Sequence, residues 1–254
     1  IREAVMKLGF RDMYEVSLGA DFVSKNEGQE LLEHYEAGEK MTTSCCPAFV
    51  SLIKKHYPQV LKYMSTTVSP MTATGRLIKA MHPDAVCVFI GPCIAKKSEV
   101  IDSITFGGAD YAMTYEELAS MFEAKNIDPE ECTETLQQGS KFGKQYSVSG
   151  GVTAAVLETF KEANKEVDLK VKTCSGALEC KKALMLLKVG KLPEDFIEGM
   201  ACVGGCVNGP AMLGKSRTFL KDRNGQIAKA DDRGVLENVA QYDEYGINMT
   251  RNHQ

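Results

Sequence analysis

Four cysteines in three widely separated segments place the strongest constraint on how this 254-residue chain folds. The segments are TSCCPAF with Cys46, GPCIAKK with Cys93, and ACVGGCVNG with Cys202 and Cys206; each contains Pro, Gly or both. Such segments form loops, in which glycine allows the backbone to approach a bound group closely. If the fold brings these loops together, they supply four soft thiolate ligands, the number that a 4Fe–4S cluster requires.

Zinc is the competing interpretation of four cysteines. Structural zinc sites usually combine two short Cys pairs, whereas here one C-x3-C pair joins two lone cysteines. The spacing therefore favours an iron–sulfur cluster and leaves zinc as the alternative. The chain has nine cysteines and no signal-peptide pattern, which favours reduced thiols or metal ligands over a disulfide framework.

The remaining cysteines allow simpler interpretations. Cys87 lies in the apolar run AVCVFI and, like Cys132, is expected to be a buried free thiol. Cys174 and Cys180 form a C-x5-C pair, for which two packed thiols are expected and an accessory site is the alternative. Cys45 directly precedes a predicted ligand, so its side chain points elsewhere and is either a packed thiol or a group that carries protons.

Composition narrows the class of protein. The chain has 30 Lys and Arg against 34 Asp and Glu, a net charge of −4 without a basic stripe, which argues against a nucleic-acid partner. No apolar run reaches the roughly 18 residues of a membrane-spanning helix. The chain begins inside a helical pattern without an initiator Met. We therefore expect a cytoplasmic domain excised from a longer protein, with no membrane partner and an oligomeric state that the sequence does not determine.

Short apolar runs alternate with helical patterns, which predicts an α/β fold with mostly parallel sheets. Because several predicted strands end in loops that contain cysteine, the site is expected at the carboxyl edges of the sheets. Strands are expected at 12–17, in AVCVFI, and at 167–175 and 194–202. Helices are expected at 1–10, 25–37, from about Pro47 to Pro58, from Ser69 and Pro70 to Pro83, at 115–126 with Thr114 as N-cap, and at 149–164 and 177–190.

Charged residues near the cysteine segments have two interpretations each. Glu27 and Glu30 share one face of a predicted helix, and a solvated face is the ordinary interpretation of such a pair. Lys96 and Lys97 are ordinarily surface lysines as well. However, a lysine three residues beyond a ligand can also donate a hydrogen bond to an anionic ligand, with Glu99 as its partner.

Taken in this order, TSCCPAF, GPCIAKKSE and MACVGGCVNG resemble the catalytic domain of iron-only (FeFe) hydrogenases. KLGF, GADF, STTVSP, SGGV and DFIEGMAC extend the resemblance from residue 2 to about residue 215. The resemblance implies two lobes of mostly parallel sheet flanked by helices, with the cofactor site in the cleft between them. It also implies that 1–254 is a fragment that lacks a cofactor-covering N-terminal segment and ferredoxin-like domains, with a polar C-terminal tail at about 213–254.

The resemblance implies a cofactor in two parts. One is a 4Fe–4S cluster, and the other is a diiron unit with CO, cyanide and azadithiolate ligands, joined to the cluster by one cysteine. By position in the motifs, Cys46, Cys93, Cys202 and Cys206 correspond to the cluster ligands, with Cys206 as the bridge. Whether this fragment by itself holds the cofactor stays open.

The resemblance also assigns roles outside the cluster ligands. Cys45 corresponds to the thiol that shuttles protons to the azadithiolate, and Glu27, Ser65 and Glu30 correspond to the path from this thiol to solvent. The residues that correspond to cofactor contacts or their supports are Lys96 as donor to a cyanide, Glu99 as its support, Met200 packed on the diiron unit, and Ser44 beside the site.

The function implied is reversible reduction of protons to H2, in an anaerobic setting, with ferredoxin or N-terminal iron–sulfur domains as the electron partner. One alternative is a non-catalytic relative similar to iron–sulfur assembly factors and prelamin-binding proteins, which lack the diiron unit. Another is an H2-sensing domain. Cys45, Lys96, Glu27 and Glu30 together favour the enzyme.

Several positions depart from the family pattern and indicate a divergent branch. GPC stands in place of the usual MPC, so Gly91 replaces a methionine. SPMT places Met71 where a glutamine is usual, and YSVSGGV places Tyr146 and Ser147 in the expected pocket wall. The last motif, CVGGCVNGPAM, also differs from the common CPGGC pattern. These changes leave the rate, the reduction potential and the preferred direction of the reaction undetermined.

Overall fold

Two small parallel sheets organise the chain, whose computed structural model describes residues 1–102, 105–131, 136–214 and 216–251. All pairings between named strands in the described residues are parallel, which confirms the prediction of an α/β fold with mostly parallel sheets flanked by helices. The larger sheet has the order β1-β5-β4 and the smaller the order β2-β3. The strands are β1 (Met41–Thr42), β2 (Val88–Ile90), β3 (Tyr111–Met113), β4 (Val171–Ser175) and β5 (Phe196–Met200).

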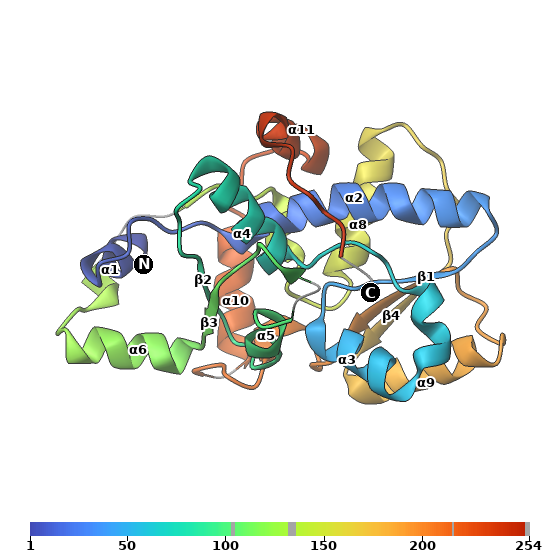
Figure 1. Cartoon of the computed structure of the whole chain (residues 1–254), viewed down its shortest axis with the longest axis horizontal. Helices are drawn as coiled ribbons and strands as arrows, with labels where there is room; N and C mark the ends of the chain where they lie inside the picture. Colours follow the sequence, from blue (N-terminus) through green and yellow to red (C-terminus); the bar gives the residue numbers. More distant parts are fainter. Residues whose placement is uncertain (103–104, 132–135, 215, 252–254) are drawn as a thin grey trace.

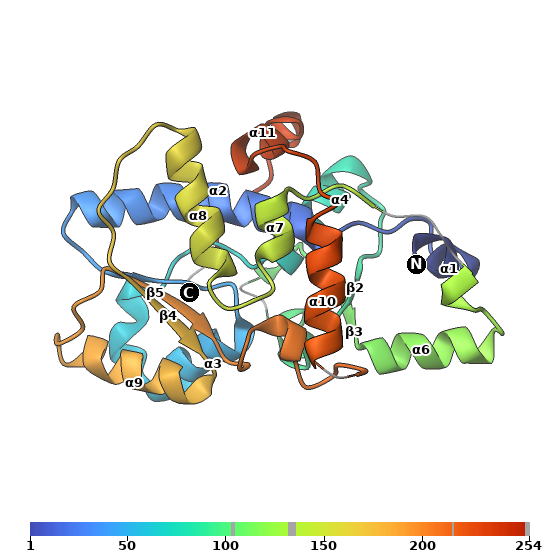
Figure 2. The same cartoon turned by 180° about the vertical axis from the view of Figure 1, so that it is seen from behind.

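Helices cover both faces of the larger sheet (Figures 1 and 2). Its central strand β5 is buried along its whole length, and neighbouring side chains point to opposite faces. Phe196 packs in a core cluster with residues of α2 and α8, and Ile197 packs in another with residues of α3 and α9. These helices are α2 (Val16–Glu36), α3 (Pro47–His56), α8 (Gly151–Glu162) and α9 (Ala177–Lys188).

The smaller sheet lies in the other half of the molecule (Figure 1). Near it are α1 (Arg2–Lys7), α4 (Pro70–Met81), α5 (Ala95–Glu99) and α6 (Tyr115–Ala124). Thr114 caps α6 as predicted, in a reciprocal capping box with Glu117.

The remaining elements are short helices, and none of the helices described is long and apolar enough to cross a membrane. The polar segment beyond residue 213 contains three of them. The elements are η1 (Pro58–Tyr63), η3 (Pro129–Glu131), α7 (Lys141–Gln145), η4 (Cys206–Asn208), α10 (Ser216–Ile227), α11 (Val235–Ala240) and η5 (Asp243–Tyr245).

The predicted strand at 12–17 is wrong. The Glu15 backbone N–H donates to the Gln138 side chain, and its carboxylate accepts from the Gln138 N–H at 2.7 Å, so these groups are satisfied without a strand partner. Helix α2 then begins at Val16, nine residues before the predicted start at Lys25. Its early part contains Gly19, a poor helix former that conceals the start of the helix in the sequence.

Candidate metal centre

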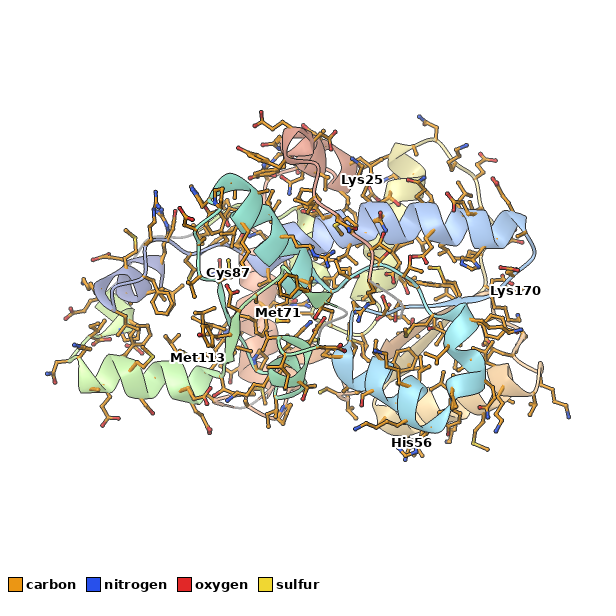
Figure 3. The ribbon with its side chains drawn as sticks, in the orientation of Figure 1. Lys25, His56, Met71, Cys87, Met113 and Lys170 are labelled. Atoms are coloured by element: carbon orange, nitrogen blue, oxygen red, sulfur yellow. The ribbon has the colours of Figure 1, made fainter. Side chains whose placement is uncertain are left out.

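A cavity of about 1530 Å³ is lined by residues from both halves of the molecule, including all four predicted ligands and Cys45. Each cysteine segment follows the carboxyl end of a strand: Cys46 follows β1, Cys93 follows β2, and Cys202 and Cys206 follow β5. This is the edge at which parallel sheets usually bind ligands. The labelled Met71, which also lines the cavity, lies near the middle of the molecule in Figure 3.

Local chain geometry places each segment at the start of a helix. Cys46 is the N-cap of α3, with Pro47 at its first position, and Cys206 begins η4. Between Cys202 and Cys206 the chain turns through Gly204 and Gly205, whose φ angles of 82° and 98° favour glycine. Helix N-termini favour negative charge, so this placement suits thiolates.

The four thiols are close enough to influence one another electrostatically. Burial, followed by the neighbouring Cys46 and Cys93, raises the pKa of Cys206 to about 12. Burial, again followed by those two neighbours, also raises the pKa of Cys202. A bound metal deprotonates its coordinating thiols and offsets the repulsion between neighbouring thiolates. The donor set therefore fits a metal group.

The four cysteines line one cavity without forming a compact set of ligands for a single ion among the described residues. Within the described part of the chain, no three His, Cys, Asp or Glu side chains converge as a single metal ion requires. The cysteines instead line a large common cavity. In a 4Fe–4S cluster each thiolate binds a different iron, so the ligands stand farther apart than around one zinc ion. Four thiols along one cavity also match the ligand number of a 4Fe–4S cluster.

Cys45 lies beside a buried carboxyl group. Burial, and then the neighbouring Glu27, raises the pKa of the Cys45 thiol well above its usual range. Glu27 is completely buried in α2, and neither carboxyl oxygen has a hydrogen-bond partner in the structure. Burial and the charge of Glu30 raise the Glu27 pKa to about 8; the Ser44 backbone and the Ser65 hydroxyl lower it only in part and make no bond of normal geometry.

A hydrogen-bonded set around Glu30 lies next to this carboxyl group, on the side toward the surface. The Ser65 hydroxyl donates to Glu30 at 2.6 Å, and the Thr66 N–H donates to the other Glu30 oxygen at 2.7 Å. Thr67 Oγ1 donates to Glu30 at 3.0 Å. The structure thus brings together Cys45 and the three predicted path residues. The last of them, Glu30, is half-buried, so its carboxylate is partly exposed.

Lys96 also lines the cavity, as part of a buried charged network. Its ammonium donates to Glu99 at 2.6 Å and to Ser69 Oγ at 2.8 Å. The other Glu99 oxygen lies 3.8 Å from the guanidinium of Arg251. Two buried cations therefore share one carboxylate. The excess positive charge beside the cavity favours an anionic ligand, because uncompensated buried charge is costly.

The other predicted site residues differ in how they face the cavity. Met200 lines it and is almost fully buried. Ser44 does not line it, and its hydroxyl donates to the Thr67 carbonyl oxygen. Four of the positions that depart from the family pattern line the cavity: Met71, Gly91, Tyr146 and Ser147.

Arg251 is a residue near the site that the sequence did not reveal. It lies in a polar stretch 158 residues beyond Cys93, and no motif surrounds it. Only the fold places its buried side chain beside Glu99 and the backbone of Ser44. A single arginine at such a sequence distance carries no signal that pattern analysis detects.

The profile of the family described as iron only hydrogenase large subunit, C-terminal domain, matches residues 1–210. The chain belongs to this family. The periplasmic Fe hydrogenase large subunit of Nitratidesulfovibrio vulgaris is 32% identical over 83% of the chain and 62% of its own length. Iron hydrogenase 1 of Clostridium pasteurianum is 27% identical over 100% of the chain and 51% of its own length. The chain thus spans about half to three fifths of these relatives.

The other similar proteins include both a hydrogenase and a protein that is not named as one. The nuclear prelamin A recognition factor of Mus musculus is 26% identical over 80% of this iron-only hydrogenase family chain and 55% of its own length. A solved structure of a single-residue variant of the FeFe hydrogenase HydA1 from Chlamydomonas reinhardtii superposes with a TM-score of 0.74 at 22% identity, over 96% of the chain and 82% of its own. This structural likeness shows the fold.

Of the cysteines outside the predicted ligand set and Cys45, three are buried free thiols in the described residues. Cys174 and Cys180 are fully buried in the core cluster of α3 and α9, and a hydrogen bond between them lowers the pKa of Cys174 and raises that of Cys180. This arrangement agrees with packed thiols. Cys87 is buried at the cavity wall, as predicted for a free thiol, whereas Cys132 lies outside the described residues.

Proposed function

We propose that this domain interconverts protons and H2 at a 4Fe–4S cluster that Cys206 bridges to a diiron unit bearing CO, cyanide and azadithiolate. The observation that supports the proposal is that Cys45 neighbours the buried Glu27, and that Ser65, near Glu27, donates to the partly exposed Glu30. A protein that only stores or transfers a cluster has no need of such a path.

The four cavity cysteines would hold the cluster as thiolates, and the position of Cys46 at the start of α3 suits that charge. The bound cofactor would supply the two-electron chemistry in 2H⁺ + 2e⁻ ⇌ H2. The chain's own contribution is to move protons. Cys45 would exchange a proton with the reacting group, and Glu27, with a pKa of about 8, can both accept and release one near neutral pH.

Lys96 would bind the anionic part of the cofactor. An ammonium group has three protons to donate, and Glu99 and Ser69 accept two of them. The third remains for a ligand in the cavity that Lys96 lines. Met200 would pack against the same group, which excludes water from it.

The second candidate is a non-catalytic iron–sulfur protein. Similarity to the prelamin A recognition factor and to the Danio rerio protein named cytosolic Fe-S cluster assembly factor narfl supports it. In the hydrogenase proposal, electrons would come from ferredoxin or from iron–sulfur domains of the same protein. An H2-sensing role would use the same site with slower turnover.

The test is infrared spectroscopy and H2 turnover on protein prepared without oxygen, reconstituted with iron and loaded with a diiron azadithiolate complex. We expect CO and cyanide stretching bands that shift under H2. Cys45→Ser should keep the bands and the iron content but lower turnover at least about tenfold, because a hydroxyl is a poor proton carrier at neutral pH.

Cys87→Ser is the matched control. Cys87 also lines the cavity but has no place in the proton path, so its variant should retain turnover. Undiminished turnover in Cys45→Ser would remove this thiol from the mechanism. A cluster signal without CO and cyanide bands would favour the non-catalytic candidate.

A further inference from the structure

The last described residues of the chain return to the candidate centre. After α11, the trace descends into the middle of the molecule (Figure 1). There the Val68 N–H donates to the Met249 carbonyl at 2.8 Å, and the Arg251 N–H donates to the Thr66 carbonyl at 2.7 Å. An antiparallel bridge joins the same two segments. The segment 66–68 connects Ser65, in the proton path, with Ser69, which binds Lys96.

The guanidinium of Arg251 joins two loops of the site. Its Nε donates to the Thr67 carbonyl at 3.0 Å, and its Nη2 donates to the Ser44 carbonyl. Ser44 directly precedes Cys45 and Cys46 in the chain. The planar guanidinium fork holds several donors in fixed directions, so one side chain fixes both loops relative to each other.

The same guanidinium balances the charge around Lys96. Glu99 Oε2 accepts from Lys96, whereas Glu99 Oε1 has no hydrogen-bond partner in the structure and lies 3.8 Å from Arg251. Without Arg251, the Glu99 charge would act on Lys96 alone. With it, the carboxylate is shared, and the Lys96 ammonium is less strongly bound to it.

We propose that Arg251 is a positioning residue for the metal centre: its fork holds the loop of Cys45 and Cys46 in place, and its charge, shared through Glu99, leaves Lys96 free to bind an anionic ligand. The first half concerns the chain alone. The second half rests on the proposed function, because it requires the cofactor.

The first half is tested on metal-free protein by alkylation with iodoacetamide and mass spectrometry. In Arg251→Gln and in Arg251→Lys, Cys45 should be alkylated at least about tenfold faster than in the parent. A tenfold change corresponds to a decrease of about 1.4 kcal/mol in the free energy of local opening. Lysine at position 251 should not restore the slow alkylation of Cys45, because one ammonium group does not reproduce the two fixed hydrogen bonds of the guanidinium. Cys174, which is fully buried elsewhere, reports global opening and should react at the parent rate.

Arg76→Gln is the matched control. Arg76 donates to the Asn248 and Thr250 carbonyls and thus anchors the same segment, but its side chain bonds to neither Ser44 nor Glu99 among the described residues. The Arg76→Gln substitution should increase the alkylation rate of Cys45 less than the Arg251 substitutions do. Equal acceleration of Cys45 and Cys174, or an unchanged Cys45 rate in both Arg251 variants, would overturn the first half.

The second half is tested by infrared spectroscopy on protein loaded with the diiron complex. Arg251→Gln should shift the cyanide stretching bands, and Arg251→Lys, which keeps the charge, should restore the parent frequencies. Unshifted bands in Arg251→Gln would overturn this half. If the parent protein shows no cyanide bands at all, the proposed function and this half fail together, while the alkylation result stands on its own.

Discussion

Glu27 is the residue whose environment most requires a functional explanation. A buried carboxyl group without a hydrogen-bond partner costs folding free energy, and burial raises its pKa to about 8. In the sequence, the pair Glu27 and Glu30 predicts an ordinary solvated helix face, and only the family resemblance indicates otherwise. The structure buries the first and leaves the second half-exposed.

The raised pKa predicts how stability depends on pH. The folded state keeps the Glu27 proton up to about pH 8, whereas the unfolded chain releases it near 4.5. The contribution of the raised Glu27 pKa to the free energy of unfolding is therefore fully present below pH 4.5. It is lost as the pH rises from 4.5 to about 8, by at most about 1.4 kcal/mol per pH unit. Glu27→Gln cannot ionise, so it should become progressively more stable than the parent over this range.

Urea unfolding of the metal-free proteins between pH 5 and 8 measures this difference. The comparison is between two proteins that share all other titrating groups. Asp21, whose pKa burial raises to about 6, therefore contributes equally to both curves. Parallel profiles for parent and Glu27→Gln would show that Glu27 ionises normally in the folded state.

At the scale of elements, local signals predict helix starts well and non-local packing poorly. Pro47, the cap at Ser69 and the capping box at Thr114 all start helices where the sequence indicates. The three residues of β3, in contrast, become a strand only through pairing with β2, far away in the chain. The early start of α2 is missed for a related reason, because the close contact with α4 that leaves room only for glycine at position 19 is not visible in the local sequence.

That contact gives a prediction for Gly19→Ala. A Cβ at this position would lie 2.2 Å from Thr74 Oγ1 and 2.3 Å from the Pro70 carbonyl oxygen, so α2 and α4 would have to separate. We expect a loss of about 1–3 kcal/mol in unfolding free energy, measured by urea denaturation.

Gly225→Ala in α10 is the matched control. No atom lies within 4 Å of the Cβ position there, and the site is exposed. Alanine should therefore stabilise the protein, by at most about 1 kcal/mol through helix propensity. If both substitutions changed the unfolding free energy equally, α2 and α4 would be able to pack together with a side chain at position 19.

At the scale of the whole molecule, the candidate centre lies between parts that come from distant regions of the chain. The motifs identify the cysteines, but the spacing alone leaves zinc and iron–sulfur open. The fold adds what the sequence lacks, because it places the four thiols along one common cavity. The fold also adds Arg251, whose guanidinium lies 3.8 Å from Glu99.

Because Cys93 follows the smaller sheet and the other ligands follow the larger one, a cluster bound by all four would link both halves. Cys93→Ala should therefore lose the cluster, seen as loss of iron and of the reduced-cluster EPR signal after reconstitution. It should also lose the stabilisation that ligand binding adds, about 2.7 kcal/mol when free ligand exceeds its dissociation constant a hundredfold. Cys87→Ala, a thiol on the same cavity wall, should keep both. Full iron loading of Cys93→Ala would contradict the assignment of this ligand, and with it the proposal that the cluster links the two sheets.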